Sequence, residues 1–161
     1  MDFLWTPWRY HYVITPGNTG DCVFCAAARS GNDKDHMVVF RATHNFVIVN
    51  RFPYTAGHIM VVPYAHVATL GELADEALVE QILLARECEK HLRELYTPDG
   101  LNIGMNIGKS AGAGVAAHIH LHVLPRWTGD TSFLTTVAES RLLPESLDIT
   151  WQRLSRAFQA R

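Results

Sequence analysis

The 161-residue sequence has little of what secreted, membrane or nucleic-acid-binding proteins require. Three cysteines, an odd number, argue against a secreted disulfide framework and favour reduced thiols in the cytoplasm. The net charge is only −2 with the histidines neutral, so no basic surface for nucleic acid is expected. Polar residues interrupt the apolar runs, and no basic, apolar leader follows Met1. We therefore expect a cytoplasmic protein that contacts neither nucleic acid nor membrane and binds any anionic ligand locally.

No repeat, low-complexity tract or linker divides the chain, and 48% hydrophobic residues suffice for one core. We expect a single domain, 1–161, with an N-terminal arm (1–36), a catalytic core (37–134) and a C-terminal tail (135–161). The aromatic beginning, residues 1–25, is punctuated by proline and glycine, which predicts irregular structure.

Five segments rich in valine, isoleucine and phenylalanine predict strands, at 37–41, 45–50, 58–63, 101–107 and 118–124. Apolar residues recur every three or four positions over 73–96, which predicts a long amphipathic helix with Cys88 on its core side. Thr69 and Glu72 could form a capping box at its start, although Asp75 is an equally good start. A short closing helix is expected beyond Pro144. Short turns and no βαβ alternation predict an α+β fold with an antiparallel sheet of about five strands.

Three histidines alternate with apolar residues in HIHLHVL, residues 118–124. In a strand, His118, His120 and His122 share one face, and the apolar residues between them enter the core. Buried imidazoles need hydrogen-bond partners, so the histidine face is expected to line a cleft. Residues two apart are separated by roughly 6.6 Å, too far for one metal to bind all three. One imidazole could attack while its neighbours orient it or contact the substrate. A surface strand that merely carries histidines is the alternative.

A glycine-rich loop, GMNIGKSAGAG at residues 104–114, precedes the histidines. Its glycines, Gly104, Gly108, Gly112 and Gly114, let backbone N–H groups approach an anionic ligand, and Asn106, Lys109 and Ser110 add donors. It is not a GxxxxGK[ST] loop, because the lysine precedes the glycines and a strand follows. Alone it is better explained as a flexible hairpin. Beside three histidines it supplies the anion cradle that phosphoryl or nucleotidyl transfer needs.

The motif His118-Ile-His120-Leu-His122-Val-Leu matches at every position the signature of the histidine-triad superfamily of nucleotide hydrolases and transferases. Residues 46–70, FVIVNRFPYTAGHIMVVPYAHVATL, resemble the family's nucleoside-side hairpin. LWTPWRY, CVFC, NIGKSAGAG and RWTGDTSF are similar to a bacterial branch that includes dinucleoside tetraphosphate phosphorylases and fragile-histidine-triad-like hydrolases. The resemblance covers residues 4–134.

This resemblance implies a covalent mechanism in which His120 attacks the α-phosphorus of a nucleotide, with adenine nucleotides of the diadenosine tri- or tetraphosphate type as expected substrates. His58 and His122 would contact the phosphate oxygens or the leaving group, and Asn50 would contact the ribose. The anion would be steadied by loop residues, namely Asn106, Gly108, Ser110, Gly112 and Gly114. Asn106 stands near a position where the eukaryotic hydrolases carry glutamine, so water and orthophosphate both stay open as acceptors. Adenosine phosphoramidate hydrolysis is an alternative.

Cys22 and Cys25 have a spacing common in zinc sites. In zinc-bearing relatives of the family, including galactose-1-phosphate uridylyltransferase, the ligands correspond to Cys22, Cys25, His66 and His118, so the resemblance implies a structural zinc and no organic cofactor. Two reduced cysteines in a packed arm are the alternative, and a thioredoxin-like redox pair is disfavoured because no βαβ pattern surrounds them.

Two other classes of function stay open: a zinc-dependent hydrolase with a catalytic metal, and a nucleotide-binding module without chemistry, which the intact His120 argues against. The remaining histidines, His11, His36, His44 and His91, are expected at the surface. The resemblance also implies a homodimer formed through the long helix and a neighbouring strand. The apolar residues Leu78, Ile82, Leu83 and Leu84 spread over more than a narrow stripe of that helix, which leaves surface for a partner. The aromatic arm, or Trp151 and Phe158, could extend to the partner's site.

Overall fold

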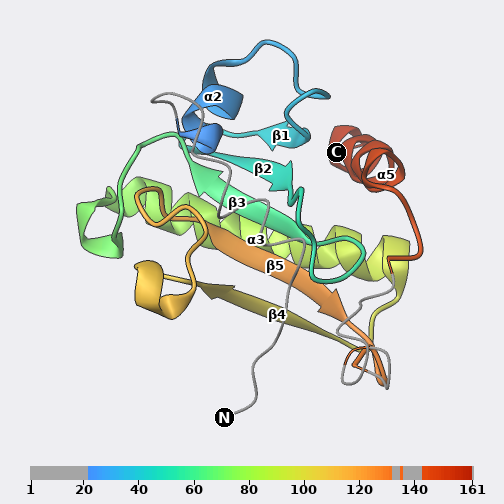
Figure 1. Ribbon diagram of the computed structural model, residues 1–161. Coiled ribbons are helices and arrows are strands. Elements are labelled where there is room, and N and C mark those ends of the chain that lie inside the picture. The colour runs from blue at the N-terminus through green and yellow to red at the C-terminus, as the bar shows by residue number, and fades with distance from the viewer. Residues whose placement is uncertain (1–21, 132–134, 136–142, 161) are drawn as a thin grey trace.

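The computed structural model describes residues 22–131, 135 and 143–160, in which a five-stranded sheet carries helices on both faces (Figure 1). The strands are β1 (Val38–Arg41), β2 (Asn45–Val49), β3 (Ile59–Pro63), β4 (Gly100–Met105) and β5 (Leu121–Arg126). The helices are α2 (Val23–Arg29), α3 (Asp75–Tyr96) and α5 (Leu147–Gln159), with the short 3₁₀ helices η1 (Leu70–Glu72) and η2 (Lys109–Ala111). The strand order is β1-β2-β3-β5-β4, and every neighbouring pair is antiparallel. The predicted α+β fold is confirmed.

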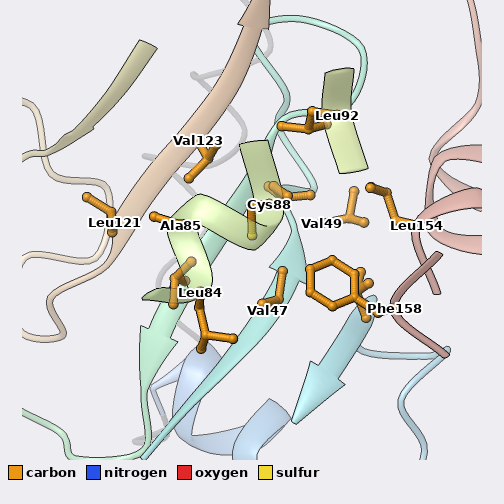
Figure 2. Packing of buried hydrophobic residues seen from close by; sticks show 13 residues of the cluster. Val47, Val49, Leu84, Ala85, Cys88, Leu92, Leu121, Val123, Leu154 and Phe158 are labelled. Atoms are coloured by element: carbon orange, nitrogen blue, oxygen red, sulfur yellow. The ribbon is translucent and has the colours of Figure 1, made fainter. Parts of the chain in front are cut away.

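One face of the sheet packs against α3 and α5. Val47 and Val49 of β2, like Val123 of β5, point toward the apolar stripe of α3, where Cys88 and Leu92 are fully buried (Figure 2). The predicted core position of Cys88 is therefore confirmed. The Thr69–Glu72 capping box is present, but it begins η1 instead of α3. Asp75 and Glu76 stand in the first turn of α3, where their charges favour the helix dipole.

The opposite face of the sheet carries α2. Phe24 and Ala27 of this helix are buried against Phe46, Ile48 and Met60. The expectation of irregular structure through residue 25 is wrong from Val23 onward. The sequence VFCAAAR contains three alanines, the residue with the highest helix propensity, and the sheet buries the apolar side that results. Residues 1–21 of the expected arm lie outside the described residues.

The histidine-bearing strand begins later than predicted, at Leu121. Pairing with β3 joins Leu121 to Val61, His122 to Met60 and Val123 to Ile59. Before that point the backbone N–H of Ile119 bonds to the Val67 carbonyl, in the segment that follows β3 (2.8 Å). His118 and His120 therefore precede β5, in a segment whose backbone is bonded to the loop after β3 and not to a neighbouring strand.

His91 is buried (6% exposed), so its expected surface position is wrong. Its ring packs against Phe158 of α5, with ring centroids 4.5 Å apart. The predicted closing helix thus covers a side of α3 that the helical pattern alone assigned to solvent. His44 is exposed as expected, His36 is half-buried, and His11 lies outside the described residues.

Gly57, directly before His58, has a backbone φ of +76°. A Cβ at this position would lie 3.1 Å from Leu92, 3.2 Å from Tyr96 and 3.3 Å from Pro125. Only glycine meets both demands, a left-handed backbone and no side chain.

Within the described ranges, no helix has the length and apolar character that crossing a membrane requires.

Candidate active site and metal cluster

A pocket of about 290 Å³ opens on the α2 face of the sheet. Its apolar wall includes Phe24 and Ala27 of α2, with Ile48 and Met60 from the sheet opposite. Its polar lining includes His120 and His122, with Asn50 from the segment after β2 and Gly112 and Gly114 from the glycine-rich loop. The arrangement is a mostly apolar cleft with a few convergent polar groups, which is typical of a small-molecule site.

His120 has the geometry of a nucleophile. Its Nδ1 lies 2.8 Å from the backbone carbonyl oxygen of His118, which can only accept, so Nδ1 carries the proton and Nε2 keeps a free lone pair. Burial lowers the pKa of His120, and its ring is 4% exposed. The imidazole is therefore neutral near pH 7, the form in which Nε2 can attack an electrophile.

His122 is oriented by a chain of hydrogen bonds that starts at the backbone. The Tyr54 N–H donates to Nδ1 of His58 (3.1 Å), so a neutral His58 carries its proton on Nε2 and donates to Nδ1 of His122 (3.0 Å). The proton of His122 is then on Nε2. Burial, and then the neighbouring His120, lowers the pKa of His122 to about 4. His122 is thus a neutral hydrogen-bond donor beside His120, and the fully buried His58 stands behind it.

Asn50 lies between the pocket and His58. Its side-chain nitrogen is 3.4 Å from both ring nitrogens of His58, and its Oδ1 accepts the Phe52 N–H at 2.9 Å. The N–H of Asn50 also donates to the His58 carbonyl oxygen (3.0 Å), which closes the segment between β2 and β3. These bonds fix an amide group at the rim of the pocket.

A separate cluster joins α2 to the histidine segment. Ligand atoms of Cys22, Cys25, His66 and His118 all lie within 4.8 Å of one another. The Sγ of Cys25 is 3.2 Å from Nδ1 of His66, that of Cys22 is 3.4 Å from Nδ1 of His118, and the two Nδ1 atoms are 3.2 Å apart. Tetrahedral ligands about 2.0–2.3 Å from one zinc ion lie roughly 3.3–3.8 Å apart, close to the three contacts of 3.2–3.4 Å, and two thiols with two imidazoles have the donor chemistry of a zinc site.

A hydrogen bond from Nε2 of His118 orients the ring so that Nδ1 faces the cluster. Nε2 lies 2.9 Å from the Pro63 carbonyl oxygen, so it carries the proton and Nδ1 faces the thiols with a free lone pair. Burial lowers the pKa of His118, which keeps the ring neutral, as a metal ligand must be. None of the four cluster residues lines the pocket.

The structure brings together most, but not all, of the residues that the sequence analysis singled out. Asn106, Gly108 and Ser110 do not line the pocket; Gly108 precedes η2 and Ser110 lies within it, whereas Gly112 follows it. The sequence analysis missed several contributors, Val115 among them. His36 lines the pocket, and α2 supplies part of its wall. The spacing of Phe24 and Ala27, three residues apart after the first cysteine, is the sequence pattern that could have predicted the contribution of α2.

The HIT domain family model matches residues 32–129 of this chain. The chain belongs to the HIT domain family.

Similar HIT proteins come from several bacteria. The AP-4-A phosphorylase of Mycobacterium tuberculosis H37Rv is 33% identical over 159 residues, which cover 94% of this chain and 82% of the relative. An uncharacterized 16.1 kDa HIT-like protein of Mycoplasma pneumoniae is 32% identical over 136 residues, covering 84% of this chain and 91% of the relative.

Solved HIT structures share the fold. A zinc-bound histidine triad family protein from Mycobacterium smegmatis superposes with a TM-score of 0.70 at 30% identity, covering 87% of this chain and 94% of that one. The diadenosine triphosphate hydrolase of Plasmodium falciparum, solved with cyclomarin A, gives a TM-score of 0.63 at 19% identity, covering 80% and 77% of the two chains. At that identity the likeness is one of fold.

Proposed function

We propose that this HIT-family enzyme cleaves the α-phosphate linkage of dinucleoside polyphosphates through a covalent intermediate on His120. The observation that carries the proposal is the unprotonated Nε2 of a neutral His120, which lines a mostly apolar pocket and whose Nδ1 is bonded to a backbone carbonyl. The activity named for the mycobacterial phosphorylase supports the substrate class.

In the first step, the lone pair of His120 Nε2 forms a bond to the α-phosphorus while the bond from that phosphorus to the bridging oxygen breaks. The departing polyphosphate leaves as an anion, so no proton has to be transferred to it. His122 donates its Nε2–H to the phosphate oxygens, and His58 holds that tautomer. In the second step, an oxygen of water or orthophosphate attacks the same phosphorus, the N–P bond breaks, and neutral His120 is restored. Water loses a proton to the solvent in this step, whereas an orthophosphate oxygen attacks as an anion.

The pocket volume is near the lower end of the range for ligand sites, which suits one nucleoside and its α-phosphate. Its apolar wall would hold the base, and Asn50 would contact the ribose. The amides of Gly112 and Gly114 would meet the α-phosphate. Asn106, Gly108 and Ser110 would meet the phosphates that extend beyond the pocket.

We also propose that Cys22, Cys25, His66 and His118 bind a structural zinc. The metal would supply four bonds that pin the start of α2 to the histidine segment. With four protein ligands outside the pocket, no coordination position is left for a substrate, which disfavours a zinc-dependent hydrolase. No organic cofactor is needed for the steps above, and a cytoplasmic location stays a prediction.

The test is product identification after incubation with diadenosine tri- and tetraphosphate and with adenosine phosphoramidate, each with and without orthophosphate. Hydrolysis of the tetraphosphate yields AMP and ATP, and phosphorolysis yields ADP and ATP. Release of AMP from the phosphoramidate alone would favour the alternative hydrolase. If no substrate releases a nucleotide, the enzyme proposal is wrong and a binding module remains.

A homodimer is a further part of the proposal. Leu84 of α3 is buried, but Val79, Ile82 and Leu83 are 60%, 61% and 45% exposed. Ile103 of the edge strand β4 is 46% exposed and pairs with Val123, so it lies on the same side of the sheet as α3. This apolar surface is available to a second copy related by a two-fold axis.

We expect light scattering at micromolar concentration to give twice the chain mass of 18.1 kDa. Ile82→Glu should give the monomer mass, because it places a charge in the proposed contact. Lys90→Glu changes an exposed charge on the same helix and should leave the dimer intact. A wild-type mass near 18.1 kDa would mean that α3 serves one subunit alone.

A further inference from the structure

The helix α2 has two roles at the pocket, although it has only seven residues. It supplies Val23, Phe24, Ala26 and Ala27 to the wall. The ring of Phe24 also packs against His120, with centroids 4.9 Å apart, and against His118 at 5.3 Å. The position of α2 therefore sets both the width of the pocket and the packing of the nucleophile.

So short a helix is not stable by itself, and its ends must be fixed by the rest of the protein. The start of α2 is fixed by the cysteines of the metal cluster, since Cys22 is its N-cap and Cys25 lies in its first turn. The end of α2 lacks partners within the helix for its last carbonyl groups.

Arg41, the last residue of β1, bonds to these carbonyl groups. Its Nη1 donates to the Ala28 oxygen at 3.0 Å, and its Nη2 donates to the oxygens of Ala27 (2.8 Å) and Ser30 (3.0 Å). Its Nε donates to Asp33 at 2.9 Å, which fixes the orientation of the guanidinium group. A planar group with five donors can make all of these bonds, whereas a lysine ammonium cannot span them.

We propose that Arg41 is a positioning residue of the nucleotide site, which fastens the end of α2 to β1 and acts in parallel with the metal cluster at its start. Loss of the Arg41 anchor loosens the wall, and loss of both anchors lets α2 move away from His120. Arg41 does not line the pocket, so its effect on a nucleotide passes through α2. The proposal rests on the proposed function in that the ligand is taken to be a nucleotide.

Arg153 is a matched control. Its Nη2 donates to the Leu95 oxygen near the end of α3, and its Nη1 pairs with Glu145 at 2.8 Å. Arg41 and Arg153 are comparably exposed, at 28% and 40% of their side chains. Arg153 therefore makes the same kinds of bond at a helix that forms no part of the pocket wall.

The experiment compares Arg41→Met, Arg41→Lys and Arg153→Met in the zinc-loaded protein. Calorimetry with AMP measures binding, steady-state assays with diadenosine tetraphosphate separate KM from kcat, and amide hydrogen exchange follows residues 23–30 without nucleotide. We expect Arg41→Met to weaken AMP binding about tenfold, through several lost charge-assisted hydrogen bonds. It should also raise KM more than it lowers kcat and speed exchange in α2, with zinc content unchanged. Arg41→Lys should lie between this variant and wild type.

Arg153→Met should lower the melting temperature without any of these changes. Chelation should weaken AMP binding far more in Arg41→Met than in wild type, because the second anchor is then lost. Wild-type AMP affinity in Arg41→Met, or unchanged exchange in α2, overturns the positioning role. Wild-type protein that binds no AMP overturns the proposed function and the positioning role with it, while faster exchange in α2 would still identify Arg41 as an anchor of the helix.

Discussion

His120→Asn is expected to lower turnover of a dinucleoside polyphosphate by roughly 10⁴-fold or more, because it removes the Nε2 atom that forms the bond to phosphorus in the proposed mechanism. An asparagine fits the space of the imidazole without adding a charge. Asn50, the apolar wall and the glycine amides are unchanged, so AMP affinity should stay within about threefold of wild type. Initial rates and calorimetry on the same preparation measure the two quantities.

The control for this variant is His44→Asn, which changes an exposed histidine outside the pocket and should keep wild-type turnover. Near-wild-type turnover in His120→Asn would show that another group attacks. Weaker AMP binding in proportion to the lost turnover would mean that His120 binds the ground state instead.

Cys22→Ser is expected to lower the bound zinc from close to one per chain to a small fraction of that. The start of α2 then loses its bond to the histidine segment, and the melting temperature should fall by roughly 10 °C, equivalent to a few kcal/mol in a chain of this size. AMP affinity should fall much less than the zinc content does, since Arg41 still holds the end of the helix. Elemental analysis and a thermal melt give both values.

Cys88→Ser separates loss of metal from loss of a thiol. Cys88 is fully buried on the side of α3 that packs against the sheet, so this variant should lower the melting temperature while the zinc content stays the same. Protein prepared without chelator that contains no zinc would contradict the metal site.

The parts of the fold that depend on local pattern could be predicted from the sequence. The repeat in α3 is long enough to fix its type, and β2 and β3 are short apolar runs that a turn separates. The residues of the site could be named because His120, Asn50 and the two cysteines lie in motifs. Their spacing along the chain carries the information.

The parts that depend on distant contacts could not be predicted. β5 begins at Leu121 because the preceding residues bond to the segment after β3, more than 50 residues earlier. His91 is buried because α5 returns to cover it. Arg41 is adjacent in sequence to no motif, and its role depends on the fold that places β1 beside the end of α2. Each is a tertiary effect that overrides a correct local pattern.

The tight packing at Gly57 sets how much variation the site tolerates. Position 57 touches no ligand in the proposed mechanism, yet any added carbon would press on side chains of α3 and β5 and displace the adjacent His58. That histidine selects the tautomer of His122. A change in the backbone at residue 57 would therefore alter which ring nitrogen of His122 carries the proton. Among all substitutions of Gly57, loss of activity is therefore expected to follow side-chain size and backbone preference instead of polarity. Every residue other than glycine is expected to lower activity at this position.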